Sequence, residues 1–167
     1  MDNEFRITAE NFWQVQCWRY GKMVWEEEYP NLVCTAGKND LLTKYFKGSS
    51  YTAAWYVGLI TNSPTPTLAV GDTAAQINGT NGWTESSAYG SRFAWTGGTA
   101  ANGSIDNSAS QASIGITGPD SIYGAFLAST SANAGTGGIL YGEGAFSSVR
   151  SVLNGDTLLV TVTLTVS

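Results

Sequence analysis

The sequence predicts a mainly β fold, namely a single-domain antiparallel β-sandwich or barrel of about ten short strands with one short helix near residues 40–47. Two patterns predict this fold. Segments with alternating or wholly apolar side chains recur at short intervals, and turn signals that include four Asn-Gly pairs separate them. The length of 167 residues suits one domain, because domains usually contain ~100–200 residues. We therefore expect one β domain over residues 1–167, in which residues 1–30 form an N-terminal hairpin and a candidate extension toward neighbouring molecules.

The N-terminal hairpin is indicated by two β-rich segments, residues 12–19 and 23–29, on either side of a short turn at residues 20–22. Apolar and polar residues alternate in the first segment. This alternation places three apolar side chains on one face of the strand, those of Trp13, Val15 and Cys17. We expect Pro30 and Asn31 to end the second strand, and residues 32–35 to form a third.

One segment has helical periodicity. Asn39 or Asp40 can accept hydrogen bonds from the first free backbone N–H groups of a helix, and Gly48 suits the left-handed position after its end. Lys44 and Lys47 lie in the last turn, where the helix dipole favours cations. We expect the helix to pack one apolar stripe against a sheet, formed by Leu41, Leu42, Tyr45 and Phe46.

The remaining strands follow from composition. Residues 52–60 are apolar on both faces, which is typical of a central strand, and residues 129–138 form a small-residue loop that connects strands or becomes ordered against a partner. Residues 157–166 alternate valine or leucine with threonine, which predicts a strand with Val160, Val162, Leu164 and Val166 buried. Further strands are expected at residues 84–89, 92–95, 112–117, 122–128, 139–141 and 145–151.

Charge excludes several classes of partner. The net charge of −5 and the pI near 4.5 leave no basic surface with which to neutralise phosphates, so we expect neither nucleic acid nor an anionic membrane as a partner. The longest apolar run, residues 53–60, is much shorter than the ~20 residues of a membrane helix. The first six residues lack the basic start and apolar run of a signal peptide, so we expect synthesis in a cytoplasm.

The residue types exclude most catalytic chemistry. The chain contains no histidine, which removes Ser-His-Asp and Cys-His catalysis and every imidazole metal ligand. Its two cysteines, Cys17 and Cys34, are interpreted as reduced, buried apolar residues, although a bridge between them stays open. We expect no enzyme activity, no catalytic residues, no cofactor and no metal site.

Paired carboxylates are the remaining enzymatic alternative, since glycoside hydrolysis needs two of them. Glu26 and Glu28 share one face of a strand and Glu27 the other, a pattern that favours a charged edge which discourages aggregation. Glu85 and Glu143 are candidates for a sugar cleft, but single carboxylates in loops are usually only solvated. The carboxylates therefore leave the non-enzymatic interpretation in place.

Aromatic residues supply the candidate contacts. Trp13, Trp25 and Trp55 lie on strongly patterned strands and are expected in the core, whereas Trp83 and Trp95 lie in a polar, Gly-rich region. Exposed aromatics there suit a protein interface or a platform for sugar rings. The candidate partner-contact residues are Trp83, Trp95, Arg92 and Tyr89.

Three sequence blocks together resemble a group of small β-rich virion structural proteins of tailed bacteriophages. These blocks are Asn31 to Gly48 with its continuation Ala54-Trp-Tyr-Val-Gly-Leu, then Gly82-Trp-Thr-Glu, and Arg150-Ser-Val-Leu-Asn-Gly-Asp-Thr-Leu with the strand that follows. The resemblance spans roughly residues 24–167 and is weakest in the middle loops. It carries no catalytic residues.

The resemblance implies a structural role in a phage particle. The leading expectation is a capsid decoration or cement protein that binds and stabilises the lattice of the major capsid protein, as a homo-oligomer among whose forms a trimer is favoured. Such a protein is made in the host cytoplasm and resides in the virion. A tail or tail-fibre-associated structural protein is the first alternative, and a glycan-binding module for host adsorption is the second.

Overall fold

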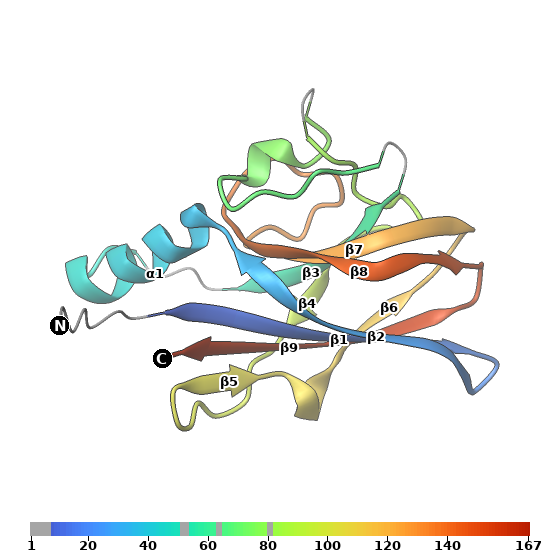
Figure 1. Cartoon of the computed structure of the whole chain (residues 1–167), viewed down its shortest axis with the longest axis horizontal. Helices are drawn as coiled ribbons and strands as arrows, with labels where there is room; N and C mark the ends of the chain where they lie inside the picture. The colour runs from blue at the N-terminus through green and yellow to red at the C-terminus, as the bar shows by residue number, and fades with distance from the viewer. Residues whose placement is uncertain (1–7, 51–53, 63–64, 80–81) are drawn as a thin grey trace, which may run out of the picture.

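The computed structural model describes residues 8–50, 54–62, 65–79 and 82–167, and in this part of the chain it is mainly β (Figure 1). One α-helix occurs there, α1 (Thr35–Lys47), with two short 3₁₀ turns at Ala74–Gln76 and Ser108–Ser110. The strands are β1 (Ala9–Arg19), β2 (Lys22–Val33), β3 (Trp55–Thr61), β4 (Phe93–Trp95), β5 (Ser104–Asp106), β6 (Ala112–Gly115), β7 (Asp120–Ala128), β8 (Leu140–Val152) and β9 (Thr157–Val166).

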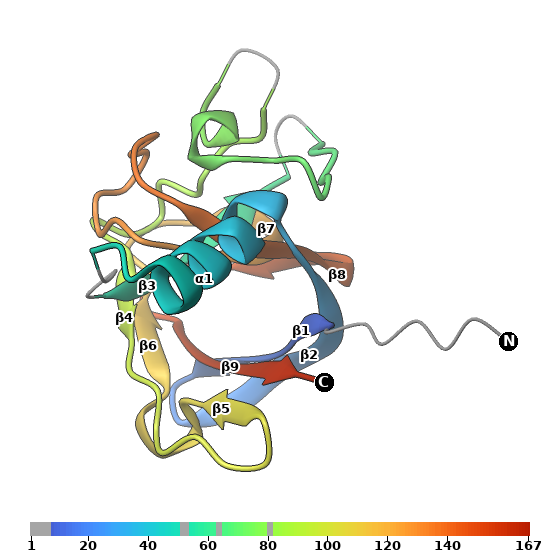
Figure 2. The same ribbon diagram turned by 90° about the vertical axis from the view of Figure 1, so that its left-hand side faces the viewer.

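The strands form one antiparallel sheet that curves into a nearly closed barrel. Their order is β4-β3-β7-β8-β2-β1-β9-β5, and β6 also pairs with β9. Strands β4 and β6 come close together, which brings the two ends of the sheet toward each other. Figure 2 shows the resulting ring from the end at which α1 crosses the opening. The predicted fold class is confirmed, including the single helix.

The N-terminal hairpin is confirmed. Arg19 pairs with Lys22, so the turn consists of Tyr20 and Gly21, whose φ angles of 48° and 73° are the two positive values that a type I′ hairpin requires. The predicted inward face of β1 is fully buried, with Trp13, Val15 and Cys17 each at 0% exposure.

Strand β2 corrects the predicted break at Pro30. The strand runs without interruption to Val33, so residues 32–35 do not form a separate strand. As far as Asn31, β2 pairs only with β1, and it pairs with β8 only at Leu32 and Val33. Because one edge of β2 has no ladder at residue 30, the missing N–H of proline is tolerated there.

Helix α1 begins earlier than predicted and ends where predicted. Gly48 follows its last residue in the left-handed conformation, with φ 63° and ψ 28°. Its N-cap is Cys34, which provides no side-chain cap, instead of Asn39 or Asp40. The start is fixed by tertiary contact, because a Cβ atom at Gly37 would lie 2.6 Å from the carbonyl oxygen of Tyr141. A glycine therefore allows the first turn to pack directly on β8.

Strand β8 unites two predicted segments. Residues 139–141 and 145–151 were expected as separate strands, but β8 is continuous through Gly142 and Gly144. A Cβ atom at Gly142 would lie 2.6 Å from Asn11, and one at Gly144 would lie 2.6 Å from Asn31. The glycines are needed where β8 passes close to the side chains of β1 and β2.

Two buried clusters stabilise the fold. The larger one fills the barrel, and it includes Val160 and Val162 of β9, both at 0% exposure, as predicted. Leu164 is partly buried, whereas Val166 is 43% exposed because it lies at the end of the barrel. The second cluster lies between the sheet and a covering segment, and it consists of Cys34, Ile60, Ala74, Ile77, Trp83, Phe126, Ala128 and Leu140.

We call the covering segment the outer layer; it comprises the described residues of 65–92 together with the loop 129–138. The predicted strand at residues 84–89 is wrong, because only isolated bridges form there, such as Ile60 with Glu85. Strand β3 is buried over residues 57–61, as expected, but it lies second from one end of the sheet instead of at its centre. Residues 52 and 53 of that prediction lie outside the described residues. Strand β3 has two buried faces because the outer layer covers the second one.

Candidate binding site at the helical end of the barrel

The helical end of the barrel, defined here as α1 together with the pocket that it borders, exposes an unusual amount of apolar surface. Figure 1 shows α1 extending past the ends of β1 and β9. Tyr45 is 80% exposed and Phe46 is 70% exposed, and their rings pack edge to face with centroids 4.9 Å apart. Five exposed large apolar side chains belong to this end, namely Leu41, Leu42, Tyr45, Phe46 and Val166.

The expected packing of α1 against a sheet is therefore wrong for most of its apolar stripe. Gly37 is the one buried residue of the helix, and it lies in the first turn, against Tyr141 of β8. The rest of the helix extends away from the sheet, so the apolar side chains of its last turns have no partner elsewhere among the described residues. Exposed apolar clusters of this kind mark interaction surfaces in folded proteins.

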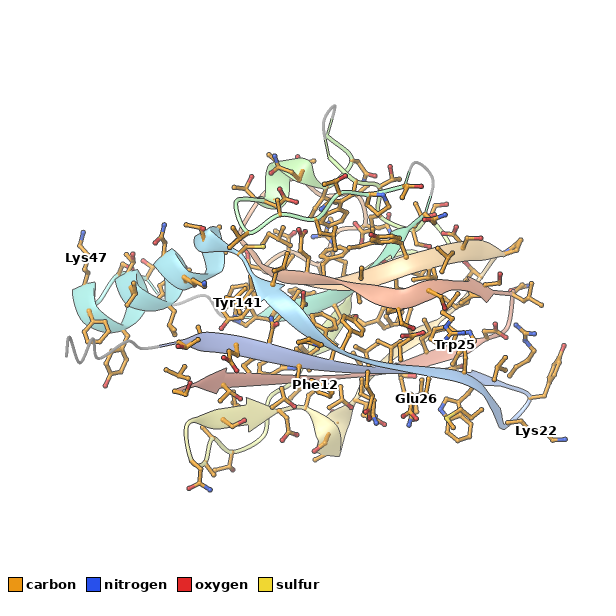
Figure 3. The ribbon with its side chains drawn as sticks, in the orientation of Figure 1. Phe12, Lys22, Trp25, Glu26, Lys47 and Tyr141 are labelled. Carbon is orange, nitrogen blue, oxygen red and sulfur yellow. The ribbon has the colours of Figure 1, made fainter. Side chains whose placement is uncertain are left out.

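Among the described residues, the same helix carries most of the exposed positive charge. Three of the four lysines of the chain lie on α1, and one of them, Lys44, forms an i,i+4 pair with Asp40 at 3.4 Å. The three described arginines are each bound to a carboxylate, in the pairs Arg19–Asp156, Arg92–Glu85 and Arg150–Glu27. Figure 3 shows Lys47 at the tip of α1 and Lys22 at the opposite end of the molecule. The tip of α1 is thus both apolar and cationic.

An aromatic pocket of about 420 Å³ opens beside α1. Trp55 of β3 pairs with Trp95 of β4, and the ring of Trp55 meets that of Tyr141 edge to face at 5.4 Å. Trp95, one of the predicted contact residues, lines this pocket and donates its indole N–H to the carbonyl of Val162 at 3.1 Å. The remaining wall is formed by Asp40, Leu41, Lys44, Ala100, Gly103, Ser104, Ile105, Leu164 and Val166.

The pocket offers few polar groups to a ligand. The hydroxyl of Ser104 lies within hydrogen-bond distance of the Leu164 carbonyl and the Thr165 hydroxyl, both at 3.3 Å. The charged groups of Asp40 and Lys44 pair with each other. Two other hollows, of about 590 and 470 Å³, contain a single aromatic side chain between them, that of Tyr123. The aromatic pocket is thus best suited to an apolar or aromatic group.

The other three predicted contact residues are buried in the outer layer. Trp83 is 1% exposed, Tyr89 3% and Arg92 3%, so none of them has the exposed surface that a partner contact needs. Trp83 packs on Phe126 with ring centroids 4.9 Å apart. These residues were expected at the surface because polar, glycine-rich sequence surrounds them, but that sequence folds over β3, β7 and β8 and encloses them.

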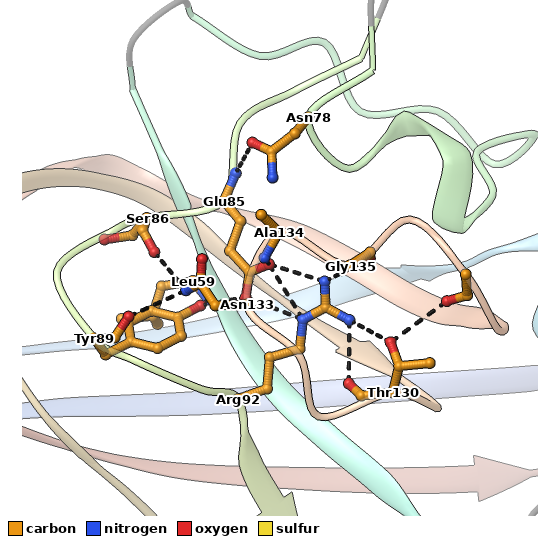
Figure 4. A network of polar contacts seen from close by, with 11 residues as sticks. Leu59, Asn78, Glu85, Ser86, Tyr89, Arg92, Thr130, Asn133, Ala134 and Gly135 are labelled. Carbon is orange, nitrogen blue, oxygen red and sulfur yellow. Dashed lines mark hydrogen bonds and ion pairs between the residues drawn. The ribbon is translucent and has the colours of Figure 1, made fainter.

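Arg92 and Glu85 form the centre of a buried polar network (Figure 4). The guanidinium donates from Nε and Nη2 to the carboxylate at 2.8–3.2 Å, and both side chains are completely buried. Arg92 also donates to Thr130 and to the carbonyl of Gly135, while Glu85 accepts from the backbone N–H of Ala134. The network therefore orders the loop 129–138 against the protein itself.

Tyr89 joins this network to the barrel wall. Its hydroxyl donates to Glu85 at 2.8 Å and accepts from the backbone N–H of Leu59 at 2.7 Å. Burial, reinforced by the Glu85 carboxylate, raises the pKa of Tyr89 well above its ordinary value, so the hydroxyl stays a donor. The polar groups of Glu85, Tyr89 and Arg92 all have hydrogen-bond partners within the protein. The network therefore holds the loops in place and leaves no free polar group for chemistry.

The carboxyl of Glu143 is also buried, and this residue lies on β8 instead of in a loop. Its Oε1 accepts from the backbone N–H of Ala69 at 3.1 Å, and Oε2 has no partner among the described residues. Burial, followed by the neighbouring Asp72 carboxylate, raises the pKa of Glu143 to about 9, so this group is protonated at neutral pH. Neither Glu85 nor Glu143 lines a sugar cleft, since both are enclosed by the outer layer.

The remaining charged and thiol groups also have structural positions. Glu27 is buried against Arg150 and Ser147, whereas Glu26 and Glu28 are exposed and accept from Gln14, so the predicted division between faces is confirmed. Cys17 and Cys34 are free and buried, as interpreted. Within the described ranges no group of three or more metal-ligating side chains forms, and no described helix could cross a membrane.

Comparison with known proteins adds no relative from which a function can be transferred. No protein-family model matches the sequence, and no curated protein matches it significantly.

Proposed function

We propose that the protein is a non-enzymatic structural protein of a tailed-bacteriophage particle, and that it acts as a capsid decoration protein bound to the major capsid protein. The observation that supports a contact function is the exposed apolar and cationic tip of α1, with Tyr45 and Phe46 at 80% and 70% exposure. An exposed aromatic pair next to an aromatic pocket is costly in water, and it is stabilised only when a partner covers it. The phage setting rests on the sequence resemblance described above.

A glycan-binding role has less support. Sugar rings need flat, accessible aromatic faces and several free hydrogen-bonding groups beside them. Trp83 is buried, and the indole N–H of Trp95 already donates to Val162. The rings of Trp55 and Tyr141 are inclined by 71°, so they do not form one flat platform.

The proposal is tested by adding the purified protein to phage heads that lack it. We expect it to bind and to raise the melting temperature of the heads, because a ligand that binds only the intact shell stabilises it by mass action. The double substitution Tyr45→Ser and Phe46→Ser should weaken binding about tenfold or more, since aromatic side chains dominate interface energies.

Tyr20→Asn provides the matched control. It removes an aromatic side chain that is 96% exposed, at the opposite end of the molecule, and asparagine tolerates its positive φ of 48°. This variant should bind heads like the unmodified protein. Binding to tails instead of heads would favour the tail-associated alternative. Unchanged head binding by the double variant, or binding to host polysaccharide with none to particles, would refute the proposal.

A further inference from the structure

The tip of α1 and the aromatic pocket have complementary chemistry within one chain. The tip presents two aromatic rings in contact with each other, and the pocket has aromatic walls formed by Trp55, Trp95 and Tyr141 with few free polar groups. Both belong to the same end of the barrel. The apolar tip of α1 therefore lies at the same end of the barrel as the aromatic pocket of about 420 Å³.

The tip cannot enter the pocket of its own chain. Leu41 and Lys44 are three residues apart on α1, and both line the pocket, so they define the helix face that is turned toward it. Tyr45 lies beside this face, Leu42 and Phe46 point away from it, and all three remain exposed. A rigid helix cannot present both faces to one pocket, so the Tyr45–Phe46 tip can enter such a pocket only on another molecule.

The tip of α1 is cationic, so it favours a partner surface that adds no further positive charge. Helix α1 has three lysines and one aspartate, a formal charge of +2, whereas the whole chain has −5. Beyond α1, the pocket is lined by no lysine or arginine. Asp106 directly follows the lining residue Ile105. Its carboxylate accepts hydrogen bonding from Ser108, which lowers the pKa of the Asp106 carboxyl, so Asp106 is ionised at neutral pH. A cationic tip thus meets no cation on the β5 side of the pocket.

We propose that the aromatic pocket of one copy receives the Tyr45–Phe46 tip of α1 from a second copy. This assembly rests on the proposed function, for which it identifies one of the two contacts that a decoration protein needs, that between its own copies. The tip then supports head binding through the oligomer, because copies joined to one another bind a repeating lattice with avidity. The arrangement closes either as a two-fold pair or as a small ring, because a tip and a pocket on every copy are satisfied in both.

The surface available is sufficient for a stable contact. A buried Phe or Tyr removes ~150–250 Å² from water, so two tips supply roughly 600–1,000 Å². The walls of two pockets lose further area, which brings the total for a two-fold pair to roughly 1,000–1,300 Å², at the lower end of specific interfaces. We therefore expect an oligomer at micromolar concentration.

The first test measures the mass of the full chain by sedimentation equilibrium. We expect a closed oligomer, with Phe46→Ser reducing the association constant about tenfold or more and Tyr20→Asn leaving it unchanged. Phe46 is exposed and does not support the fold, so a cooperative melt of Phe46→Ser verifies that the variant is folded. Ile105→Asp, on the pocket side, should have the same effect as Phe46→Ser.

The second test is a cross-link between copies. A chain with Phe46→Cys mixed under oxidation with a chain carrying Ile105→Cys should give a covalent pair of the two, and Tyr20→Cys in place of Phe46→Cys should not. The native Cys17 and Cys34 are buried and do not compete. The inference is overturned if the protein stays monomeric and forms no cross-link, even if its pocket binds an apolar dye. Head binding by such a monomer would leave the proposed function intact, whereas an oligomer that ignores particles would refute only the function.

Discussion

The barrel interior and the outer layer are both buried, but different interactions hold them. The interior is filled by apolar side chains from every long strand, such as Trp13, Leu59 and Val160. The outer layer has a smaller apolar cluster, and its loops are fixed by hydrogen bonds to two buried carboxyl groups, those of Glu85 and Glu143. Loops have no ladder of their own, so their buried backbone groups need side-chain partners. The comparison shows that the inner face of the sheet is stabilised by apolar side chains at every second strand position. The loops over its outer face also need specific buried polar side chains.

If the interior carries the cooperative stability, removing β9 should have the largest effect. Deleting residues 158–167 removes Leu158, Val160 and Val162, which are completely buried, and also the strand with which β1, β5 and β6 pair. At ~1.5–3 kcal/mol for each buried side chain, the loss is comparable with the whole stability of a domain. We expect no cooperative melt by circular dichroism. A truncated protein that melts cooperatively would show that the interior does not depend on β9.

The outer layer should respond next, through its ion pair. Arg92→Met leaves the Glu85 carboxylate buried without its cation, which costs about 3–5 kcal/mol of unfolding free energy in such pairs. Urea unfolding provides the measurement, and Arg150→Met is the control, because the Arg150 side chain is 33% exposed and water can replace it in part. Replacing Arg92 and Glu85 together by apolar residues should cost less than Arg92→Met alone. A loss below about 1 kcal/mol for Arg92→Met would mean that the layer is not held by this pair.

The interior was largely predictable from the sequence, and the outer layer was not. Alternation in β1 and β9 identifies inward residues because one face of each strand is buried and the other is not. Nothing in the local sequence distinguishes a loop that is solvated from one that folds over a sheet, so Trp83 and Arg92 were assigned to the surface. The signal that was available is β3, whose apolarity on both faces requires a cover on each.

The helical end was predictable only in part. The apolar stripe and the C-terminal glycine of α1 are correctly found in the sequence, since both are local properties. Where the helix points is not local, because it depends on the contact of Gly37 with β8. The aromatic pocket likewise combines side chains from α1, β3, β4, β5, β8 and β9, of which Trp95 is the one that the sequence predicts as a partner contact. The amphipathic stripe of α1 therefore indicates that the helix packs against something, but it does not show whether that partner belongs to the same chain or to another molecule.

The two buried carboxyl groups allow the finest test of the outer layer, through pH. Glu85 is compensated by Arg92, whereas Glu143 faces the Asp72 carboxylate and the Cys34 thiol, whose pKa is itself raised by burial to about 12. Because the pKa of Glu143 is raised from 4.5 to about 9, the folded state binds a proton that the unfolded state releases between these values. Its contribution to stability is complete below pH 4.5 and decreases as the pH rises toward 9.

Glu143→Gln should therefore flatten the pH dependence of stability, since glutamine resembles the protonated acid and does not titrate. The unfolding free energy of the unmodified protein should decrease between pH 5.5 and pH 8.5, by at most ~1.4 kcal/mol per unit, and that of Glu143→Gln should decrease less. Urea unfolding at several pH values measures both slopes, and the exposed Glu28→Gln serves as the control with an unchanged slope. Parallel curves for Glu143→Gln and the unmodified protein would show that Glu143 is already ionised in the folded state, and the layer would then hold an uncompensated charge instead of a neutral acid.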